Sequence, residues 1–315
     1  MSASIIAGTP APGAAEVPRR SSRRAGSGLL AAVRGNRKAM VGVVLLLLFV
    51  VLAAVPQLFT SISDPNKHAF ELMLPPSSDH LLGTTAFGQD IYAQLIYGTR
   101  QSLIIAVVVG GLATVLSVLV GVSAAYLGGF ADSTLSAVTD VFLVVPTFPL
   151  IIVIAAYAGK GSLPVIIGVL VVTGWAYGAR QLRAQALSLR NRDFLESARV
   201  RGERRSYIIV CEVLPTMTSL ILATFLGGAL YAVLTAAGLQ FIGLGDNNSL
   251  SWGTMLHWAQ SNAALQTGQP LWAVAPGLCI ALLGASFALL NYAFDEVSNP
   301  ALRPVRRSRG KRARS

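Results

Sequence analysis

The stretch DFLESARVRGERRSYIIVCEVLP, residues 193–215, decides the fold, because it places a charged segment between two long uncharged stretches of the chain. Asp193 followed three residues later by Glu196 is the Asp form of a capping box, so a helix is expected to begin at Asp193 and to end near Arg201. Gly202 can adopt a positive φ without steric cost, which predicts that the helix stops there.

The second half of this segment predicts another short helix. It is expected to begin at about Arg205 and to be ended by Pro215 before the next apolar stretch. Its apolar residues at helical spacing are Tyr207, Ile208, Cys211 and Leu214. The first helix is expected to gather its own apolar residues on one side, at Phe194, Leu195 and Ala198. The predicted unit is therefore a helix, a tight turn and a helix, with an apolar knob that fits a groove on another protein.

The composition of the whole chain indicates a membrane protein. Hydrophobic residues make up 53% of it and charged residues 12%, whereas a soluble domain has roughly 45–50% and about 25%. Six apolar stretches are each near or above the roughly 20 residues that a helix needs to cross hydrocarbon. These stretches are residues 39–59, 101–127, 135–157, 162–179, 217–245 and 271–294. We therefore expect six transmembrane helices.

Two other architectures are excluded by the pattern. Helices buried in a soluble protein show an apolar stripe and a polar face, but these stretches are apolar all round. Strands of a membrane barrel would alternate over about 10 residues. Because backbone groups in lipid must be satisfied within the segment, the remaining fold class is an all-α helical bundle.

The basic residues predict the orientation. Nearly all of the 25 Lys and Arg lie in the N-terminal tail, in the segment after the fourth span and in the C-terminal tail. With six spans these three segments share one face, which the positive-inside rule assigns to the cytoplasm. Both termini of this multi-pass protein are thus expected on the cytoplasmic side of the membrane. The net charge of +11 is explained by topology and anionic lipid, so no nucleic acid is expected as a partner.

This topology divides the chain into five parts. They are a basic tail (1–38), the first transmembrane helix (39–59), an external loop (60–100), a membrane core (101–297) that contains a cytoplasmic loop (186–216), and a second basic tail (298–315).

Few residues are candidates for catalysis or for metal binding. Cys211 and Cys279 are not expected to form a disulfide, and no metal site is expected. The three histidines, at positions 68, 80 and 257, are interpreted as solvated loop residues on the outer side, because they lack the spacing of a ligand pair. Trp252, Trp258 and Trp272 are expected to be anchors at the outer membrane interface. No catalytic residues are predicted.

The charged segment resembles the loop by which permease subunits of ABC importers contact their ATPases. That loop has the form Glu-Ala-Ala, three residues, Gly, nine residues, Ile, one residue, Leu-Pro. Glu196, Gly202 and the pair Leu214 and Pro215 stand at the corresponding intervals. Two positions depart from the pattern, with Ser197 in place of an alanine and Glu212 in place of the isoleucine.

The rest of the chain, roughly residues 28–303, resembles the C-type permeases of dipeptide and oligopeptide importers. The motifs that carry this resemblance are HLLGT (80–84), GQD (88–90), YGTR (97–100), GW (174–175), FIGLG (241–245), SWG (251–253) and NPALR (299–303). Thr85 and Gln89 replace an Asp and an Arg that are common in the family.

The resemblance implies a type I ABC importer permease with a cytoplasmic coupling-helix loop. It implies four kinds of partner, namely a second, B-type permease subunit, two cytoplasmic ABC ATPase subunits, an extracytoplasmic solute-binding protein and membrane lipid. The chain itself is then not an enzyme and binds no cofactor, because ATP is used by the partner subunits. The residues implied in ATPase coupling are Phe194, Leu195, Glu196, Ser197, Ala198, Gly202, Leu214 and Pro215. Peptides are the implied substrate, and nickel, glutathione and oligosaccharides stay open as alternatives.

Three residues of the third span are candidates for the translocation pathway. Asp140 is expected two turns into its span, where the dipole of a helix N-terminus would stabilise an acid even without a role in transport. Pro146 and Pro149 free backbone groups in the membrane and are expected to kink the span beside a cavity. An ion-coupled secondary transporter would need inverted repeats and intramembrane acids, and only Asp140 favours that alternative. A membrane enzyme would need a chemical constellation that the spans lack.

Overall fold

The structure is a computed structural model that describes residues 36–157, 162–246 and 249–298. Within these residues the chain is helical and forms no sheet, with one isolated bridge between Thr84 and Asp90. The prediction of an all-α fold is therefore confirmed. The predicted basic tails fall almost entirely outside the described residues.

In the described part of the chain, five helices are long and apolar enough to cross a membrane. They are α2 (Arg37–Ala54), α3 (Ile91–Leu127), α6 (Leu163–Leu189), α10 (Thr218–Phe241) and α12 (Pro270–Ser298). A sixth crossing is present if the bent pair α4 (Gly129–Val144) and α5 (Thr147–Tyr157) forms one span. The five or six candidates agree with the predicted count.

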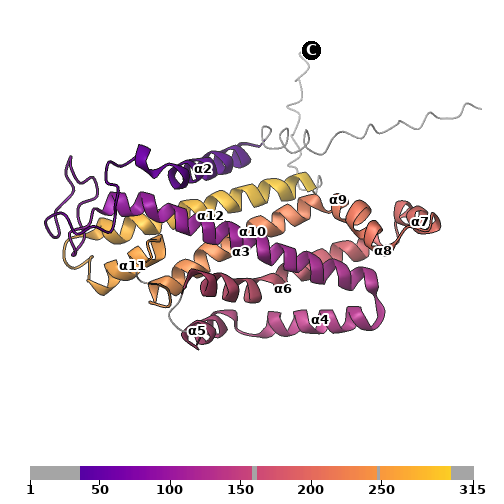
Figure 1. The fold of residues 1–315 in the computed structure, drawn as a ribbon. Coiled ribbons are helices and arrows are strands. Elements are labelled where there is room, and N and C mark those ends of the chain that lie inside the picture. The colour runs from indigo at the N-terminus through magenta and orange to yellow at the C-terminus, as the bar shows by residue number, and fades with distance from the viewer. Residues whose placement is uncertain (1–35, 158–161, 247–248, 299–315) are drawn as a thin grey trace, which may run out of the picture.

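The bundle is built around α3, which contacts α2, α4, α6, α10 and α12. Small residues allow its closest neighbours to approach. A Cβ added at Gly121 would overlap the carbonyl oxygen of Ala179 on α6, and one at Gly110 would lie 2.9 Å from the backbone nitrogen of Ala229 on α10. Such contacts between backbones are typical of helix packing in membranes. They hold α3, α6 and α10 together as the centre of the molecule (Figure 1).

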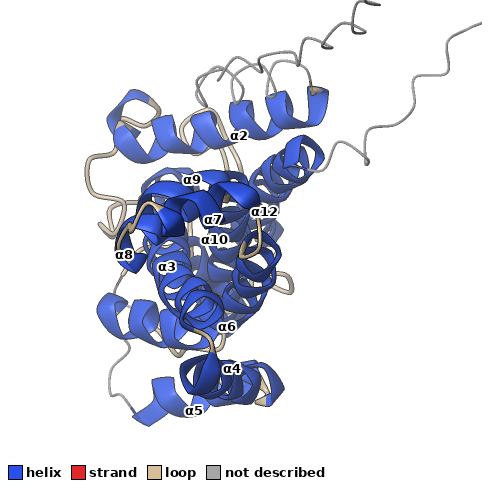
Figure 2. Ribbon diagram, turned by 90° about the vertical axis from the view of Figure 1, so that its right-hand side faces the viewer, coloured by secondary structure: helices blue, strands red, loops and turns tan. Residues whose placement is uncertain are grey.

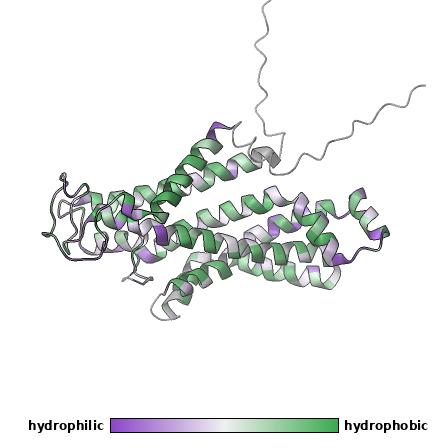
Figure 3. Cartoon of the chain, turned by 45° about the horizontal axis from the view of Figure 1, so that its top comes forward, coloured by the Kyte–Doolittle hydropathy of each residue, from purple (hydrophilic) through white to green (hydrophobic). Residues whose placement is uncertain are grey.

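The remaining helices flank this centre. Figure 2 shows α2 on one side of the bundle and the α4–α5 pair on the opposite side. Figure 3 shows that hydrophobic residues dominate the long helices, whereas hydrophilic residues gather in the loops at the two ends. This distribution is that of a bundle whose middle lies in hydrocarbon and whose ends lie in water.

The third apolar stretch is bent by 87° between α4 and the part of α5 up to Ile154. Val145 is extended, as expected for a residue before a proline, and Pro146 occupies the break. The predicted kink is therefore confirmed at Pro146. Pro149 lies in the first turn of α5, where a missing N–H breaks no helical hydrogen bond, so it does not add a second kink.

Helix α3 begins earlier than the sequence predicts. Residues 91–100, assigned to the external loop, form its first turns. The side chain of Asp90 is the N-cap and accepts a hydrogen bond of 2.7 Å from the backbone nitrogen of Ala93. The polar residues of 91–100 lower the hydropathy of this stretch, so hydropathy alone does not predict that it is part of a membrane helix. The N-cap stabilises the start of the helix in spite of these polar residues.

The loop of residues 60–90 and helix α11 (Trp252–Ser261) meet at one end of the bundle (Figure 1). Two interpretations of this end are wrong. Trp252 and Trp272 are buried among other side chains, at 0% and 2% exposed, and are not free anchors at a lipid interface. His80 is also buried, and its Nδ1 lies 2.8 Å from Oδ2 of Asp90, so it is not a solvated loop residue. His80 and Trp272 pack within and against the loop, whereas Trp252 packs against Phe49 of α2 and bonds the carbonyl oxygen of Leu95 on α3.

Candidate functional site

The segment that resembles a coupling loop lies at the end of the bundle opposite the 60–90 loop (Figure 1). It comprises α7 (Asp193–Val200), a turn, α8 (Arg205–Tyr207), a π-helical turn (Ile208–Val213) and α9 (Leu214–Thr216). We call residues 193–216 the end segment. The predicted order of helix, tight turn and helix is confirmed, although the second helix is less regular than expected.

The predicted capping box of α7 is wrong by one residue. The N-cap is Arg192, whose side chain makes no capping hydrogen bond, and Asp193 is the first helical residue. Asp193 and Glu196 both lie in the first turn, where the partial positive charge of the helix N-terminus stabilises acids. The acids therefore stabilise this helix start by their charge rather than as a box.

Gly202 adopts a φ of +79°, which confirms the predicted left-handed turn. Its N–H donates to the carbonyl oxygen of Arg199 at 2.9 Å, and the N–H of Glu203 donates to that of Ala198 at 3.2 Å. This pair of bonds is a Schellman motif, which satisfies the last carbonyls of α7. No atom lies within 4 Å of a Cβ added at Gly202, so this turn faces open space.

The sequence predicts that the apolar residues of α7 form one exposed knob, and this prediction is wrong. Leu195 and Ala198 are completely buried, in a cluster with Val122 of α3 and Leu182 of α6. Phe194 is 39% exposed and does not belong to this cluster. Adjacent residues of a helix differ in direction by about 100°, so Phe194 can face solvent while Leu195 packs inward. The buried pair attaches α7 to the bundle, and Phe194 is left free for a contact.

The second half of the end segment contains a π-helical turn that the sequence did not predict. Pro215 has no N–H to donate to the carbonyl of Cys211, four residues earlier, and a wider turn relieves the clash of its ring with that carbonyl. Pro215 does not end the helix, because α9 continues to Thr216 and the break falls at Met217. Leu214 is half-buried and Pro215 is exposed.

The two departures from the family pattern have distinct surroundings. The hydroxyl of Ser197 donates to the carbonyl oxygen of Asp193 at 2.8 Å, which a helix surface tolerates. Glu212 is half-buried, and its Oε1 lies 3.8 Å from Nη2 of Arg201 at the end of α7. The glutamate thus pairs with a cation across the turn instead of packing as an isoleucine would.

Exposed apolar side chains on the end segment form a surface at the end of the molecule. They are Phe194 (39% exposed), Val200 (84%), Tyr207 (48%) and Val210 (58%). Exposed basic residues lie near them in the same segment, at Arg192, Arg199, Arg204 and Arg205. An apolar surface with a charged rim is typical of a site for another protein.

Two ion pairs connect α4 to α6. Arg183 donates to both carboxylate oxygens of Asp132, and Arg180 pairs with the more exposed Asp140. The expectation that Asp140 lies near a helix N-terminus is wrong, because α4 begins at Gly129 and Asp132 occupies the first turn. Sequence reasoning missed Asp132. The available signal was its place three residues after Gly129, since the pair Gly128 and Gly129 favours a turn before a helix.

A cavity of about 470 Å³ lies between α3, α4, α6 and α10. Its polar lining consists of hydroxyl and amide side chains, at Thr114, Ser117, Thr147, Thr173, Tyr177, Gln181, Thr224, Tyr231 and Asn291, and the lining contains no charged residue. Asp140 borders a separate cavity of about 100 Å³, and neither Pro146 nor Pro149 lines either one. A role of these three residues in transport stays a prediction.

The spans, the broken third helix, the uncharged intramembrane cavity and the end segment define a multi-pass helical membrane permease. Residues 113–303 match the family described as binding-protein-dependent transport system inner membrane component, and the chain belongs to this family.

Relatives match over most of the chain. It is 34% identical over 277 residues to the oligopeptide transport system permease protein OppC of Mycobacterium bovis, covering 86% of this chain and 93% of that protein. It is 29% identical over 272 residues to the dipeptide transport system permease protein DppC of Alkalihalophilus pseudofirmus, covering 86% and 88%. The oligopeptide transport system permease protein OppC of Bacillus subtilis is 29% identical over 273 residues, with the same coverage.

Proposed function

We propose that this protein is a permease subunit of an ATP-driven ABC importer of peptides. In this proposal it forms half of the translocation pathway together with a second, B-type permease. Two cytoplasmic ATPases hydrolyse ATP, and an external solute-binding protein delivers the cargo. The observation that carries the proposal is the match along 86% of the chain to a permease named for oligopeptide transport.

The end segment supports the ATPase contact. Its exposed apolar residues offer a surface for another protein, whereas Leu195 and Ala198 connect it to the α3 and α6 cluster. A movement of α7 would therefore be transmitted to the helices that enclose the cavity. Rigid displacement of packed helices is a common way to switch between two accessible states.

The intramembrane cavity supports passage of a cargo that forms many hydrogen bonds. Hydroxyl and amide groups can replace water around peptide bonds, and the absence of lining charges leaves a path without strong binding. A cluster of acids, histidines or cysteines that would hold nickel does not occur among the described residues.

The ion pairs weaken the alternative of an ion-coupled transporter. Asp132 and Asp140, the acids of α4, are both paired with arginines of α6. A carboxylate that carries protons or Na⁺ across the membrane must alternate between free and bound forms. These pairs are better suited to holding α4 against α6.

The charge distribution supports a cytoplasmic end segment. Its arginines lie on the face that the positive-inside rule places in the cytoplasm, so the 60–90 loop and α11 lie outside. In this orientation the ATPases and the solute-binding protein would bind at opposite ends of the helical bundle, on opposite sides of the membrane.

Reconstitution tests the proposal. The chain is purified with the B-type permease and the ATPases encoded with it, placed in lipid vesicles and supplied with the binding protein and a radiolabelled peptide. We expect uptake that requires ATP, the binding protein and this chain. Uptake driven by a proton or Na⁺ gradient without ATP would contradict the proposal, as would ATP-driven uptake of nickel or sugars with no peptide uptake.

A further inference from the structure

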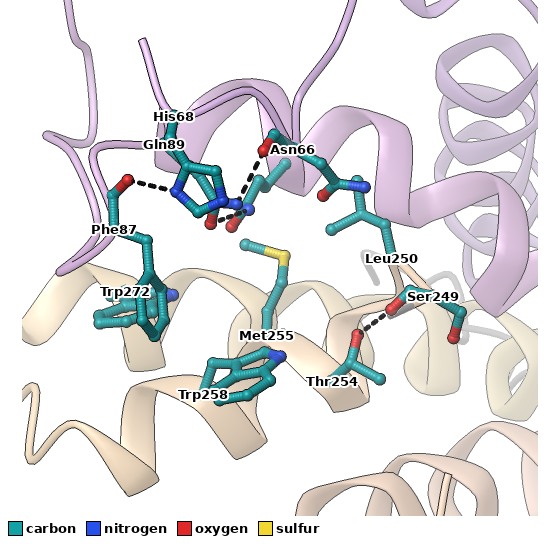
Figure 4. Close-up of a pocket in the computed structure, with 11 residues that line it drawn as sticks. Asn66, His68, Phe87, Gln89, Ser249, Leu250, Thr254, Met255, Trp258 and Trp272 are labelled. Atoms are coloured by element: carbon teal, nitrogen blue, oxygen red, sulfur yellow. Dashed lines mark hydrogen bonds between the residues drawn. The ribbon is translucent and has the colours of Figure 1, made fainter. Parts of the chain in front are cut away.

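A second cavity lies outside the transmembrane region, where the 60–90 loop packs on α11 and the start of α12. Its volume is about 310 Å³, near the lower end of the roughly 300–1,000 Å³ usual for small-molecule sites. Figure 4 shows its lining, to which the loop contributes Asn66, His68, Phe87 and Gln89, and the helices Met255, Trp258 and Trp272. We call it the outer cavity.

One wall of the outer cavity is a rigid aromatic corner. Phe87 packs edge to face against Trp258, with ring centroids 5.6 Å apart, and against Trp272 at 6.3 Å. The sulfur-containing side chain of Met255 lies beside these rings (Figure 4). Edge-to-face packing fixes the rings without closing the space between them. This corner favours an apolar side chain.

The opposite wall holds amide and imidazole groups in fixed directions. Gln89 donates from Nε2 to the carbonyl oxygen of Asn66 at 3.0 Å and accepts at Oε1 from Gln94 at 2.9 Å. Nδ1 of His68 lies 2.7 Å from the carbonyl oxygen of Phe87. Because a carbonyl only accepts, Nδ1 carries the hydrogen, and in the neutral ring Nε2 is left as an acceptor.

These groups leave hydrogen-bonding capacity directed at the cavity. The second amide hydrogen of Gln89 is a donor, and Nε2 of His68 and Oε1 of Gln94 are acceptors. A peptide bond presents one donor and one acceptor, which matches this mixture.

We propose that the outer cavity is a binding subsite for an uncharged unit of the cargo peptide, with an apolar side chain in the aromatic corner and its peptide bond against the amide wall. This inference rests on the proposed function and names the part of the cargo that the outer face recognises. The lining has no charged side chain, so the subsite takes an internal residue of the peptide and not its charged termini.

The same lining disfavours two other cargoes of related importers. Nickel would need several nitrogen or sulfur ligands, and the lining offers one histidine and no cysteine. An oligosaccharide would stack on a flat open ring, but the rings here pack edge to face, and Trp272 is 2% exposed.

A photolabelling experiment on the complete transporter in lipid vesicles tests occupancy directly. The probe is a tripeptide with a central benzophenone-bearing residue, whose excited carbonyl inserts into nearby C–H bonds. We expect mass spectrometry to find the label on Met255, and an excess of unlabelled apolar tripeptide to prevent it. Active peptide uptake with no label in the outer cavity would overturn the inference and leave the proposed function intact.

The binding protein is the other source of a peptide segment for this cavity. Cargo-free binding protein is therefore added in a parallel arm. Protection of Met255 by cargo-free binding protein, without protection by the unlabelled tripeptide, would show a docking site for that protein and would overturn the inference.

Two histidine variants give a matched comparison of uptake. His68→Ala removes a cavity group that bonds a backbone carbonyl, and His257→Ala removes a similar bond of 3.0 Å to Phe241 from a histidine that does not line the cavity. Each ring also packs edge to face on one aromatic residue of the cavity wall, His68 on Phe87 and His257 on Trp258, so the two variants differ in the hydrogen-bonding group that faces the cavity. We expect His68→Ala to raise the half-saturating concentration of an apolar tripeptide about fivefold, the change for one hydrogen bond, with the maximal rate unchanged. His257→Ala should match the unmodified protein. Equal values for both variants would contradict the subsite.

Discussion

Arg183 on α6 forms a bidentate ion pair with Asp132 on α4, with Nε 2.7 Å from Oδ1 and Nη2 2.9 Å from Oδ2. The pair joins residues 51 positions apart and attaches the start of the broken third span to the fourth. Asp140 and Arg180 form a second attachment farther along the same helices, with both side chains more than half exposed. The two pairs differ in burial and therefore in expected strength.

A double-mutant cycle compares these attachments. Because the side chains of Asp132 and Arg183 are only 20% and 33% exposed, removing Arg183 leaves a half-buried carboxylate without its cation, and Arg183→Ala should destabilise the protein by about 1–3 kcal/mol. Asp132→Asn with Arg183→Ala should show a clear coupling energy. The exposed pair Asp140 and Arg180 should couple by less than about 1 kcal/mol. Thermal unfolding of the detergent-solubilised variants measures both cycles, and equal coupling would contradict the difference in burial.

Adjacent residues of α7 should separate stability from association. Leu195→Ala removes a fully buried side chain and should cost about 2–5 kcal/mol. Phe194→Ala alters an exposed ring, so the stability should change by no more than about 0.5 kcal/mol while co-purification of the ATPases weakens. Thermal unfolding and pull-down of the ATPases give the two readouts. Normal co-purification with Phe194→Ala would show that this ring is not part of the contact.

The orientation is tested by cysteine accessibility. In a background with Cys211→Ser and Cys279→Ala, single cysteines are placed by Ser78→Cys in the 60–90 loop and Ser206→Cys in the end segment, at exposed positions. A membrane-impermeant maleimide applied to spheroplasts should label Ser78→Cys only, and Ser206→Cys should react after permeabilisation. The reverse pattern would invert the proposed topology.

The fold could be predicted because hydrophobic length is a local property of the chain. Five of the six long apolar stretches each correspond to one long helix and the third contains the bent pair α4 and α5, and the all-α class follows from backbone satisfaction in lipid. Helix starts were less accessible, since α3 begins at Ile91 on the strength of the Asp90 cap and not on hydropathy. The 87° bend was foreseen only as a kink, because its size depends on the ion pairs and packing of α4 against α6.

In the candidate site, too, the features set by local sequence could be predicted and those set by distant contacts could not. The positive φ of Gly202 was predicted because it depends on the residue and its immediate neighbours. The opposite burial of Phe194 and Leu195 was missed because it depends on α3 and α6, which lie far away in sequence. The pairing of Asp132 with Arg183 was missed for the same reason. The outer cavity likewise combines residues from the 60–90 loop and from helices near the C-terminus.

Coupling of transport to ATP hydrolysis through the end segment is tested most directly by two glycine variants. Gly202 and Gly268 have φ angles of +79° and +81°, and neither has an atom within 4 Å of an added Cβ. A valine therefore meets the same backbone strain in equally open surroundings, at opposite ends of the molecule. ATP-driven peptide uptake is measured together with co-purification of the ATPases. We predict that Gly202→Val abolishes uptake in a correctly inserted protein and weakens ATPase association, whereas Gly268→Val leaves both near normal. Normal uptake by Gly202→Val, or equal loss in both variants, would contradict a coupling role for the end segment.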